Sequence, residues 1–110
     1  MGLPNSHNAL IPTEKLTKYL LSLDHPIGRW KAKFLRSIGF DETNLDVLKD
    51  ALRSIAENGT IKDTMRTDFG TKYIIEGQIT PPHGHVVILC TVWVMEHGED
   101  PPRFVTAYPA

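Results

Sequence analysis

The chain has 110 residues, of which 41% are hydrophobic and 23% charged, and its formal net charge at pH 7 is −1. This composition is typical of one globular domain, and the near-neutral charge argues against a strongly electrostatic nucleic-acid binder, although it leaves room for a local basic patch. The single cysteine, Cys90, cannot form an intramolecular disulfide and indicates a reducing compartment. No apolar run is long enough to span a membrane. We therefore expect one cytoplasmic domain over residues 1–110.

The first half of the chain predicts helices. Apolar residues at helical spacing predict three amphipathic helices over residues 13–23, 26–38 and 44–57. Thr13 is a suitable N-cap for the first, Pro26 suits the first turn of the second, and Gly39 suits its end. Thr43 and Asp46 resemble a capping box at the start of the third.

After Gly59 the hydrophobic period changes from helical to alternating, which indicates strands. The alternating segments cover residues 60–67, 71–80, 85–95 and 102–109. The first is polar and is expected at a sheet edge, and short polar turns join each strand to the next. The predicted fold is α+β, with three N-terminal helices packed on a four-stranded antiparallel meander sheet.

The third strand is the most apolar and should be central. One alternate set is uniformly apolar and is expected on the core: Val86, Ile88, Cys90, Val92 and Val94. The other set is mixed and contains Thr91 and Trp93, so its face is expected to be more open to a ligand. Cys90 is interpreted as a small buried hydrophobe.

Lys31 interrupts the apolar stripe of the second predicted helix. A lysine among apolar side chains is unfavourable unless its stem lets the ammonium reach water or a partner holds the charge. Two interpretations remain: the side chain reaches solvent at the start of the helix, or its ammonium points across the sheet toward an anion.

Other polar residues lie near the predicted helix start and on the last strand. His25 precedes the second helix, where it is either a cap or surface residue or a group that titrates near neutral pH. Thr106 and Tyr108 share a strand face and either hold a phosphate or make ordinary strand contacts. Alternation puts Arg103 on the opposite face unless the preceding turn rotates it. The sequence contains no phosphate-binding glycine loop, and we expect no metal or cofactor.

Several motifs together resemble a small bacterial domain family of unknown function. They are Leu3-Pro4-Asn5, Tyr19-Leu20-Leu21, His25-Pro26-x-Gly28-x-x-Lys31-Ala32, Thr91-Val92-Trp93 and Gly98-Glu99-Asp100-x-Pro102-Arg103-x-Val105-Thr106-Ala107-Tyr108-Pro109. Members of that family occur as short single-domain proteins, some labelled adhesins, and as C-terminal modules of polymorphic toxins. The closing Arg-x-Val-Thr-Ala-Tyr is also similar to the last strand of toxin nucleases of the barnase–EndoU–colicin–RelE group.

The resemblance to these nucleases implies metal-independent RNA cleavage. Such cleavage needs a base, an acid and a cation for the phosphate. From the residues we expect His25 as acid or base, Lys31 and Arg103 as phosphate stabilisers, Thr106 and Tyr108 as positioning groups, and Trp93 as a base-stacking surface; a second acid or base is not evident. The alternative is a non-catalytic interaction module. The expected partners are therefore RNA, or an immunity or toxin protein, with no membrane.

Overall fold

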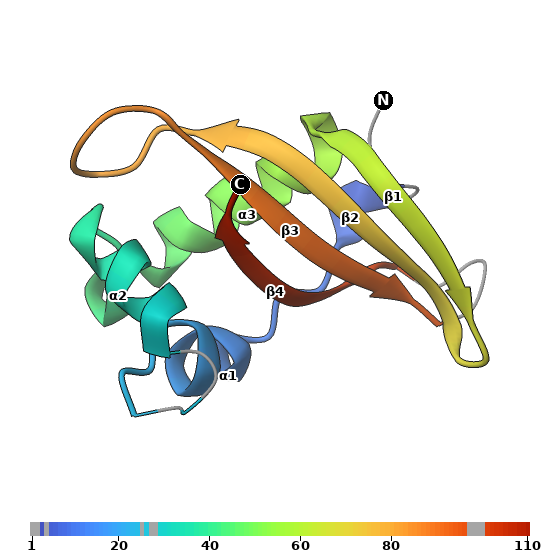
Figure 1. Ribbon diagram of the computed structural model, residues 1–110, viewed down its shortest axis with the longest axis horizontal. Helices are drawn as coiled ribbons and strands as arrows, with labels where there is room; N and C mark the ends of the chain where they lie inside the picture. The colour runs from blue at the N-terminus through green and yellow to red at the C-terminus, as the bar shows by residue number, and fades with distance from the viewer. Residues whose placement is uncertain (1–2, 4, 25, 27–28, 97–100) are drawn as a thin grey trace.

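The computed structural model describes residues 3, 5–24, 26, 29–96 and 101–110. Over these residues the chain folds as an α+β domain whose helical elements precede a four-stranded sheet (Figure 1). The strands are β1 (Thr60–Thr67), β2 (Gly70–Ile79), β3 (Val87–Met95) and β4 (Arg103–Pro109). They are antiparallel and lie in the order β1-β2-β3-β4, which confirms the predicted meander.

The first predicted helix has a different form from the regular one expected over residues 13–23. It starts as one α-helical turn, α1 (Thr13–Lys15), and continues as a π-helix, η2 (Leu16–Leu20). The N–H of Leu21 donates to the carbonyl oxygen of Leu16 at 2.7 Å, which is the wide hydrogen bond that defines this form. Short π-helical segments are rare and are frequent at functional sites.

The other two helices lie close to their predicted positions. They are α2 (Arg29–Ser37) and α3 (Leu45–Asn58). Gly39 ends α2 as predicted, with a φ of 104° that lets the N–H of Phe40 donate to an earlier carbonyl oxygen, that of Leu35, at 3.1 Å. The predicted Thr43–Asp46 capping box is wrong. The box is instead made by Asp41 and Asn44, around the 3₁₀ turn η3 (Glu42–Asn44) that leads into α3.

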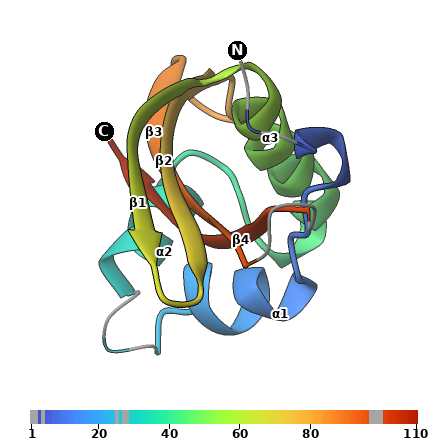
Figure 2. The ribbon, with the colours of Figure 1, turned by 90° about the vertical axis from the view of Figure 1, so that its right-hand side faces the viewer.

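The core lies between the sheet and the helices. Figure 2 shows α3 along one face of the sheet, with α1 and α2 beneath the curved strand β4. Leucine and isoleucine side chains from the helices meet large side chains from the strands, and the buried cluster includes Leu16, Leu20, Leu35, Leu48, Leu52, Ile55, Ile75, Leu89, Trp93 and Phe104. This packing anchors α1, η2 and α2 against the β4 side of the sheet.

The predicted facing of β3 is wrong. Leu89 and Trp93 are fully buried in the core, whereas Val86 and Ile88 have exposed fractions of 54% and 45%. The mixed set therefore faces the helices, and Thr91 can lie there because its hydroxyl is hydrogen-bonded within the core. Val92 is also buried, with an exposed fraction of 5%. However, it lies on the opposite face of the sheet, beside its strand partners and outside the main cluster.

A β-bulge in β4 changes which of its residues share a face. Val92 pairs with Thr106 and Trp93 pairs with Phe104, so Val105 is the extra residue. As a result Arg103, Thr106 and Tyr108 lie on the face away from α3, and Phe104 and Ala107 lie in the core. The prediction that Thr106 and Tyr108 share one face is confirmed. The bulge brings Arg103 to that face as well, which simple alternation would not do.

The two edges of the sheet differ. All eight residues of β1 are exposed, which confirms the prediction of a polar edge strand. The β4 edge is partly covered, because Leu10 exchanges backbone hydrogen bonds with Pro102 at 2.8 Å and Phe104 at 2.9 Å. Among the described residues, no helix is long and apolar enough to cross a membrane.

Candidate functional site

A polar triangle joins α2, η2 and β4. The ammonium of Lys31 donates to the hydroxyl of Tyr19 at 2.8 Å and to the hydroxyl of Thr106 at 3.0 Å. The two hydroxyls are themselves 3.1 Å apart. Each of the three side chains is only half-buried, so the triangle lies at the protein surface rather than in the core.

Aromatic rings surround the ammonium of this triangle. The distance from the Lys31 Nζ to the ring centroid is 5.4 Å for Tyr19, 5.8 Å for Trp30 and 5.8 Å for Tyr108. A second ammonium, that of Lys15, stands 5.2 Å from the centroid of the Tyr19 ring. The faces of such rings attract a cation. We call Lys31, Tyr19, Thr106, Tyr108 and Trp30 the lysine cluster.

The two tyrosines of the lysine cluster differ in acidity. Burial alone raises the pKa of Tyr19, but hydrogen bonds with Lys31 and Thr106 and the positive charges of Lys31 and Lys15 outweigh it, so the pKa is lowered. The pKa of Tyr108 is raised, first by burial and then by the neighbouring Cys90 thiol. Of the two phenols, Tyr19 is therefore the one that releases a proton more readily.

The fold brings these residues together from distant parts of the sequence. The π-helical turn holds Tyr19, the first turns of α2 hold Trp30 and Lys31, and β4 supplies Thr106 and Tyr108. Thr106 pairs with Val92 on the outer face of the sheet, and there its hydroxyl meets the Lys31 ammonium and the Tyr19 hydroxyl. Thus Lys31, Thr106 and Tyr108, three of the residues proposed from the sequence, lie in one place. His25 is outside the described residues.

Trp93 is not a base-stacking surface. Its side chain is fully buried, its indole N–H donates to the hydroxyl of Thr91 at 2.8 Å, and its ring packs edge-on against Phe104. The Thr91 hydroxyl in turn donates to the carbonyl oxygen of Ile75 at 2.9 Å. Trp93 is therefore a core residue, and the expectation that it contacts a substrate is wrong.

Arg103 lies on the same face as Thr106 but is the first residue of β4, opposite Val94. Its guanidinium forms an ion pair with Glu96, and the side chain is half exposed. The contacts of the lysine cluster described above do not include it. A small hollow of about 280 Å³ lies beside it, lined by Leu10, Val94 and Pro101 as well as the ion pair. Arg103 is thus held by a carboxylate at the surface.

Sequence reasoning missed two residues of the cluster, Trp30 and Tyr19, and of these Tyr19 makes the hydrogen bond with Lys31. In the sequence it falls at an apolar position of an amphipathic helix, where its ring suffices to explain it. The signal for a polar role would have been its hydroxyl, because a half-buried phenol needs a hydrogen-bond partner. Lysine on one predicted helix and tyrosine on another gave no indication that they meet.

Basic residues are concentrated in the part of the sequence that contains Tyr19 and Lys31. The stretch from residue 13 to residue 36 contains six basic side chains and two acidic ones, whereas the whole chain has twelve and thirteen. The basic residues of this stretch are Lys15, Lys18, Arg29, Lys31, Lys33 and Arg36. The near-neutral net charge therefore hides a local excess of positive charge in the elements that carry the cluster.

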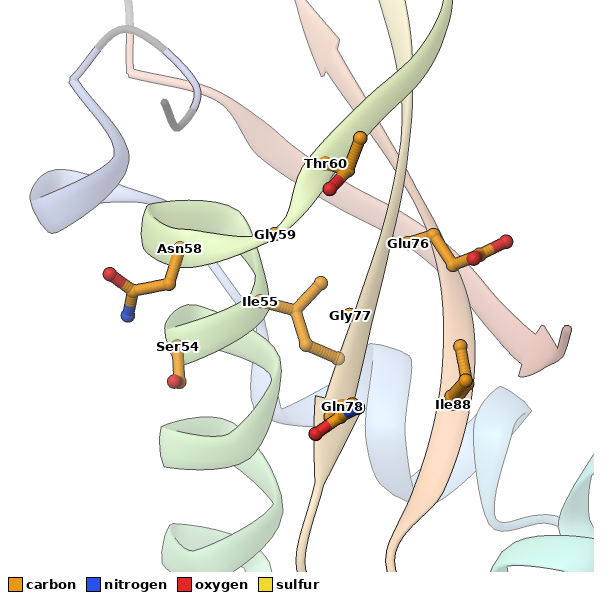
Figure 3. Close-up of a pocket in the computed structure, with 9 residues that line it drawn as sticks. All are labelled: Ser54, Ile55, Asn58, Gly59, Thr60, Glu76, Gly77, Gln78 and Ile88. Carbon is orange, nitrogen blue, oxygen red and sulfur yellow. The ribbon is translucent and has the colours of Figure 1, made fainter.

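A hollow of about 410 Å³ lies elsewhere, between the end of α3 and strands β1 to β3. Figure 3 shows that its polar side chains do not converge: Ser54 and Asn58 point away from the strands, and Glu76 points away from the helix. Within the described residues, no group of three or more His, Cys, Asp or Glu side chains is arranged to hold a metal ion. The lysine cluster is therefore the better candidate site.

The chain is a small α+β domain in which the Lys31 ammonium contacts side chains of η2 and β4. The chain belongs to the family described as a domain of unknown function (DUF6883), whose model matches residues 2–110. No curated protein matches the chain. Among solved structures, it is similar to a chain of a contact-dependent growth inhibition toxin–immunity protein complex from Klebsiella pneumoniae 342, with a TM-score of 0.74 and 16% identity over 92% of this chain and 99% of that one. This likeness establishes a shared fold.

Proposed function

We propose that the chain is a toxin-type ribonuclease domain that cleaves RNA phosphodiester bonds without a metal ion, at the lysine cluster. The observation that carries this proposal is the ammonium of Lys31, held 2.8 Å from the Tyr19 hydroxyl and 3.0 Å from the Thr106 hydroxyl at the protein surface. A fixed cation beside groups that can transfer or orient protons is what cleavage of a phosphodiester requires.

In the proposed reaction the ribose 2′-hydroxyl attacks the neighbouring phosphorus and the bond from phosphorus to the 5′-oxygen breaks. The proton of the 2′-hydroxyl passes to a base, and the leaving 5′-oxygen takes a proton from an acid. The products are a 2′,3′-cyclic phosphate and a 5′-hydroxyl. Lys31 stabilises the negative charge that grows on the non-bridging oxygens.

Tyr19 is the proposed acid. An acid is most effective when it is protonated at neutral pH and yet gives up its proton readily, and the lowered pKa of Tyr19 moves it in that direction. The ammonium of Lys31 stabilises the phenolate that remains after transfer. Thr106 orients both groups through its hydroxyl, and Tyr108 contributes a further hydroxyl on the same face. His25, four residues before α2 in the sequence, keeps the role of base.

The comparison with solved structures supports the toxin part of the proposal. A fold shared with a chain of a toxin–immunity complex is consistent with a small toxin module, and the family resemblance in the sequence points the same way. The excess of positive charge in α1, η2 and α2 provides an attractive surface for a polyanion even though the chain as a whole is near neutral.

Cleavage of a mixed RNA pool and of tRNA in the presence of a chelator tests this function. The wild-type protein should cut RNA with or without chelator, and Lys31→Met and Tyr19→Phe should each reduce the rate by about 100-fold or more, in the range for loss of an electrostatic stabiliser or a general acid. Lys33→Met is the matched control, because it removes an exposed positive charge from the same helix. Full activity of folded Lys31→Met protein would refute the site.

A non-catalytic module that binds a toxin or immunity protein is the second candidate. The observation that favours it is the shared fold with a chain of a toxin–immunity complex. It would give no RNA cleavage by the wild-type protein under any of these conditions, together with stable binding to a toxin or immunity protein. The cleavage assay therefore separates the two candidates.

A further inference from the structure

Within the lysine cluster, the most exposed aromatic side chain is that of Trp30. Its exposed fraction is 54%, while the other tryptophan of the chain, Trp93, is fully buried. An indole left half in solvent is unusual for a side chain that could have packed in the core. Its place is set by α2, where it directly precedes Lys31, and its ring centroid is 5.8 Å from the Lys31 ammonium.

The ammonium of Lys31 and the exposed ring of Trp30 are close enough together to contact the phosphate and the base of one nucleotide. A phosphate bound at the Lys31 ammonium would lie beside the indole, so the base of the same or the neighbouring nucleotide can reach the face of the ring. Aromatic side chains beside basic groups are the usual means by which proteins hold single strands, because every base has a face that can stack.

We propose that Trp30 is the stacking platform of the site and that the substrate is therefore an unpaired, single-stranded stretch of RNA. This inference rests on the proposed function for the identity of the polymer. A base within a duplex is already stacked on its neighbours and cannot lie on a side chain without being flipped out, so a duplex would gain only the phosphate contact. Trp30 is a specificity residue, whereas Lys31 and Tyr19 act on the phosphate.

Tryptophan emission provides a direct test because the two tryptophans differ so much in exposure. Three probes are compared: a single-stranded 2′-O-methyl RNA oligomer, which lacks the attacking hydroxyl, a duplex of the same length, and an abasic oligomer with the same number of phosphates. The single strand should quench the exposed component of the emission. It should also bind about 5- to 140-fold more tightly than the abasic oligomer, as expected for one stacked base.

Two variants complete the experiment. Trp30→Leu should lower affinity for the single strand to that for the abasic oligomer and leave the abasic affinity unchanged. Phe69→Leu is the control, because Phe69 is also exposed, at 81%, but lies in the β1–β2 turn. Its affinities should equal those of the wild type.

Three outcomes would contradict the role of Trp30 as a stacking platform. Equal affinities of the wild type for the single-stranded, duplex and abasic probes, an unaffected Trp30→Leu variant, or no binding of any probe would do so. Binding that depends on Lys31 but not on bases would contradict the role of Trp30 as a stacking platform and would not contradict the proposed cleavage. If the single strand quenched the emission but the protein cut no RNA, the proposed cleavage would be contradicted and the role of Trp30 would be supported.

Discussion

Replacing Lys31 with methionine separates the two roles of a half-buried lysine, a structural contact or a cation held for a ligand. The ammonium makes hydrogen bonds of 2.8 Å and 3.0 Å, and losing bonds to a charged group typically destabilises a fold by about 1.5–3 kcal/mol each when their partners are left unsatisfied. Here the Tyr19 and Thr106 hydroxyls are 3.1 Å apart and can continue to bond to each other. The substitution therefore leaves neither hydroxyl without a partner.

Two further terms favour the variant. The methionine thioether can maintain the packing of the stem against the aromatic rings, and the unfavourable desolvation of the ammonium disappears. We therefore expect the free energy of unfolding to change by less than about 1 kcal/mol, which is small beside the usual total of about 5–15 kcal/mol.

Urea unfolding followed by tryptophan fluorescence measures this difference, with Lys33→Met as the reference for loss of an exposed charge on the same helix. The midpoints of the two variants and the wild type should nearly coincide. A loss of about 3 kcal/mol or more in Lys31→Met alone would show that the ammonium holds η2, α2 and β4 together. The cluster would then be a structural contact, and its assignment as a phosphate site would lose its physical basis.

Three other predictions follow from the packing and the charges. Thr91→Val removes the hydrogen-bond acceptor of the Trp93 indole and a donor to a backbone carbonyl, so urea unfolding should show a loss of about 2–4 kcal/mol; an unchanged midpoint would contradict the buried network. Leu89→Ala should lower the free energy of unfolding by about 2–5 kcal/mol and Ile88→Ala by about 0.5 kcal/mol or less. A larger loss for Ile88→Ala than for Leu89→Ala would show that the face of β3 with Ile88 packs on the core. In a phenolate absorbance titration Tyr19 should ionise below the ordinary tyrosine pKa of 10.0. Its ionisation then stabilises the fold fully above pH 10.0, and this stabilisation is lost as the pH falls through the lower pKa of the folded state. Ionisation of Tyr19 above 10.0 would contradict its contact with Lys31.

The strand order and the polar edge could be predicted from the sequence because each depends on local signals. The change of period at Gly59, the short turns and the polar character of β1 define an antiparallel meander without long-range information. The end of α2 at Gly39 follows from the left-handed backbone that glycine adopts readily, and the structure has that conformation.

The facing of β3 could not be predicted because both of its alternate sets contain large apolar residues. The deciding feature is tertiary: Thr91 enters the core with its hydroxyl bonded to Trp93 and to a carbonyl of β2. Alternation alone treats a threonine and a tryptophan as signs of a mixed surface. The pattern of alternation does not show that the Trp93 indole and the Thr91 hydroxyl form a hydrogen bond with each other, which allows both to be buried.

The candidate site could be predicted only in part. The position of Lys31 in an apolar stripe identified a charge that needed partners, and the shared strand face identified Thr106 and Tyr108. The third partner, Tyr19, could not be identified, because its position depends on a π-helical turn that no local pattern predicted. The bulge at Val105 decides the face of Arg103. It arises from the register between β3 and β4, so the alternation of residues along the sequence does not predict it.

The most direct measurement of the central claim is the chemistry of the RNA ends after incubation with the purified protein and a chelator. Mass spectrometry of the fragments should find 2′,3′-cyclic phosphates paired with 5′-hydroxyls, formed by the wild type and by Lys33→Met but not by Lys31→Met or Tyr19→Phe. Intact RNA with the wild type, or fragments that carry 5′-phosphates, would contradict metal-independent cleavage through the 2′-hydroxyl at the lysine cluster.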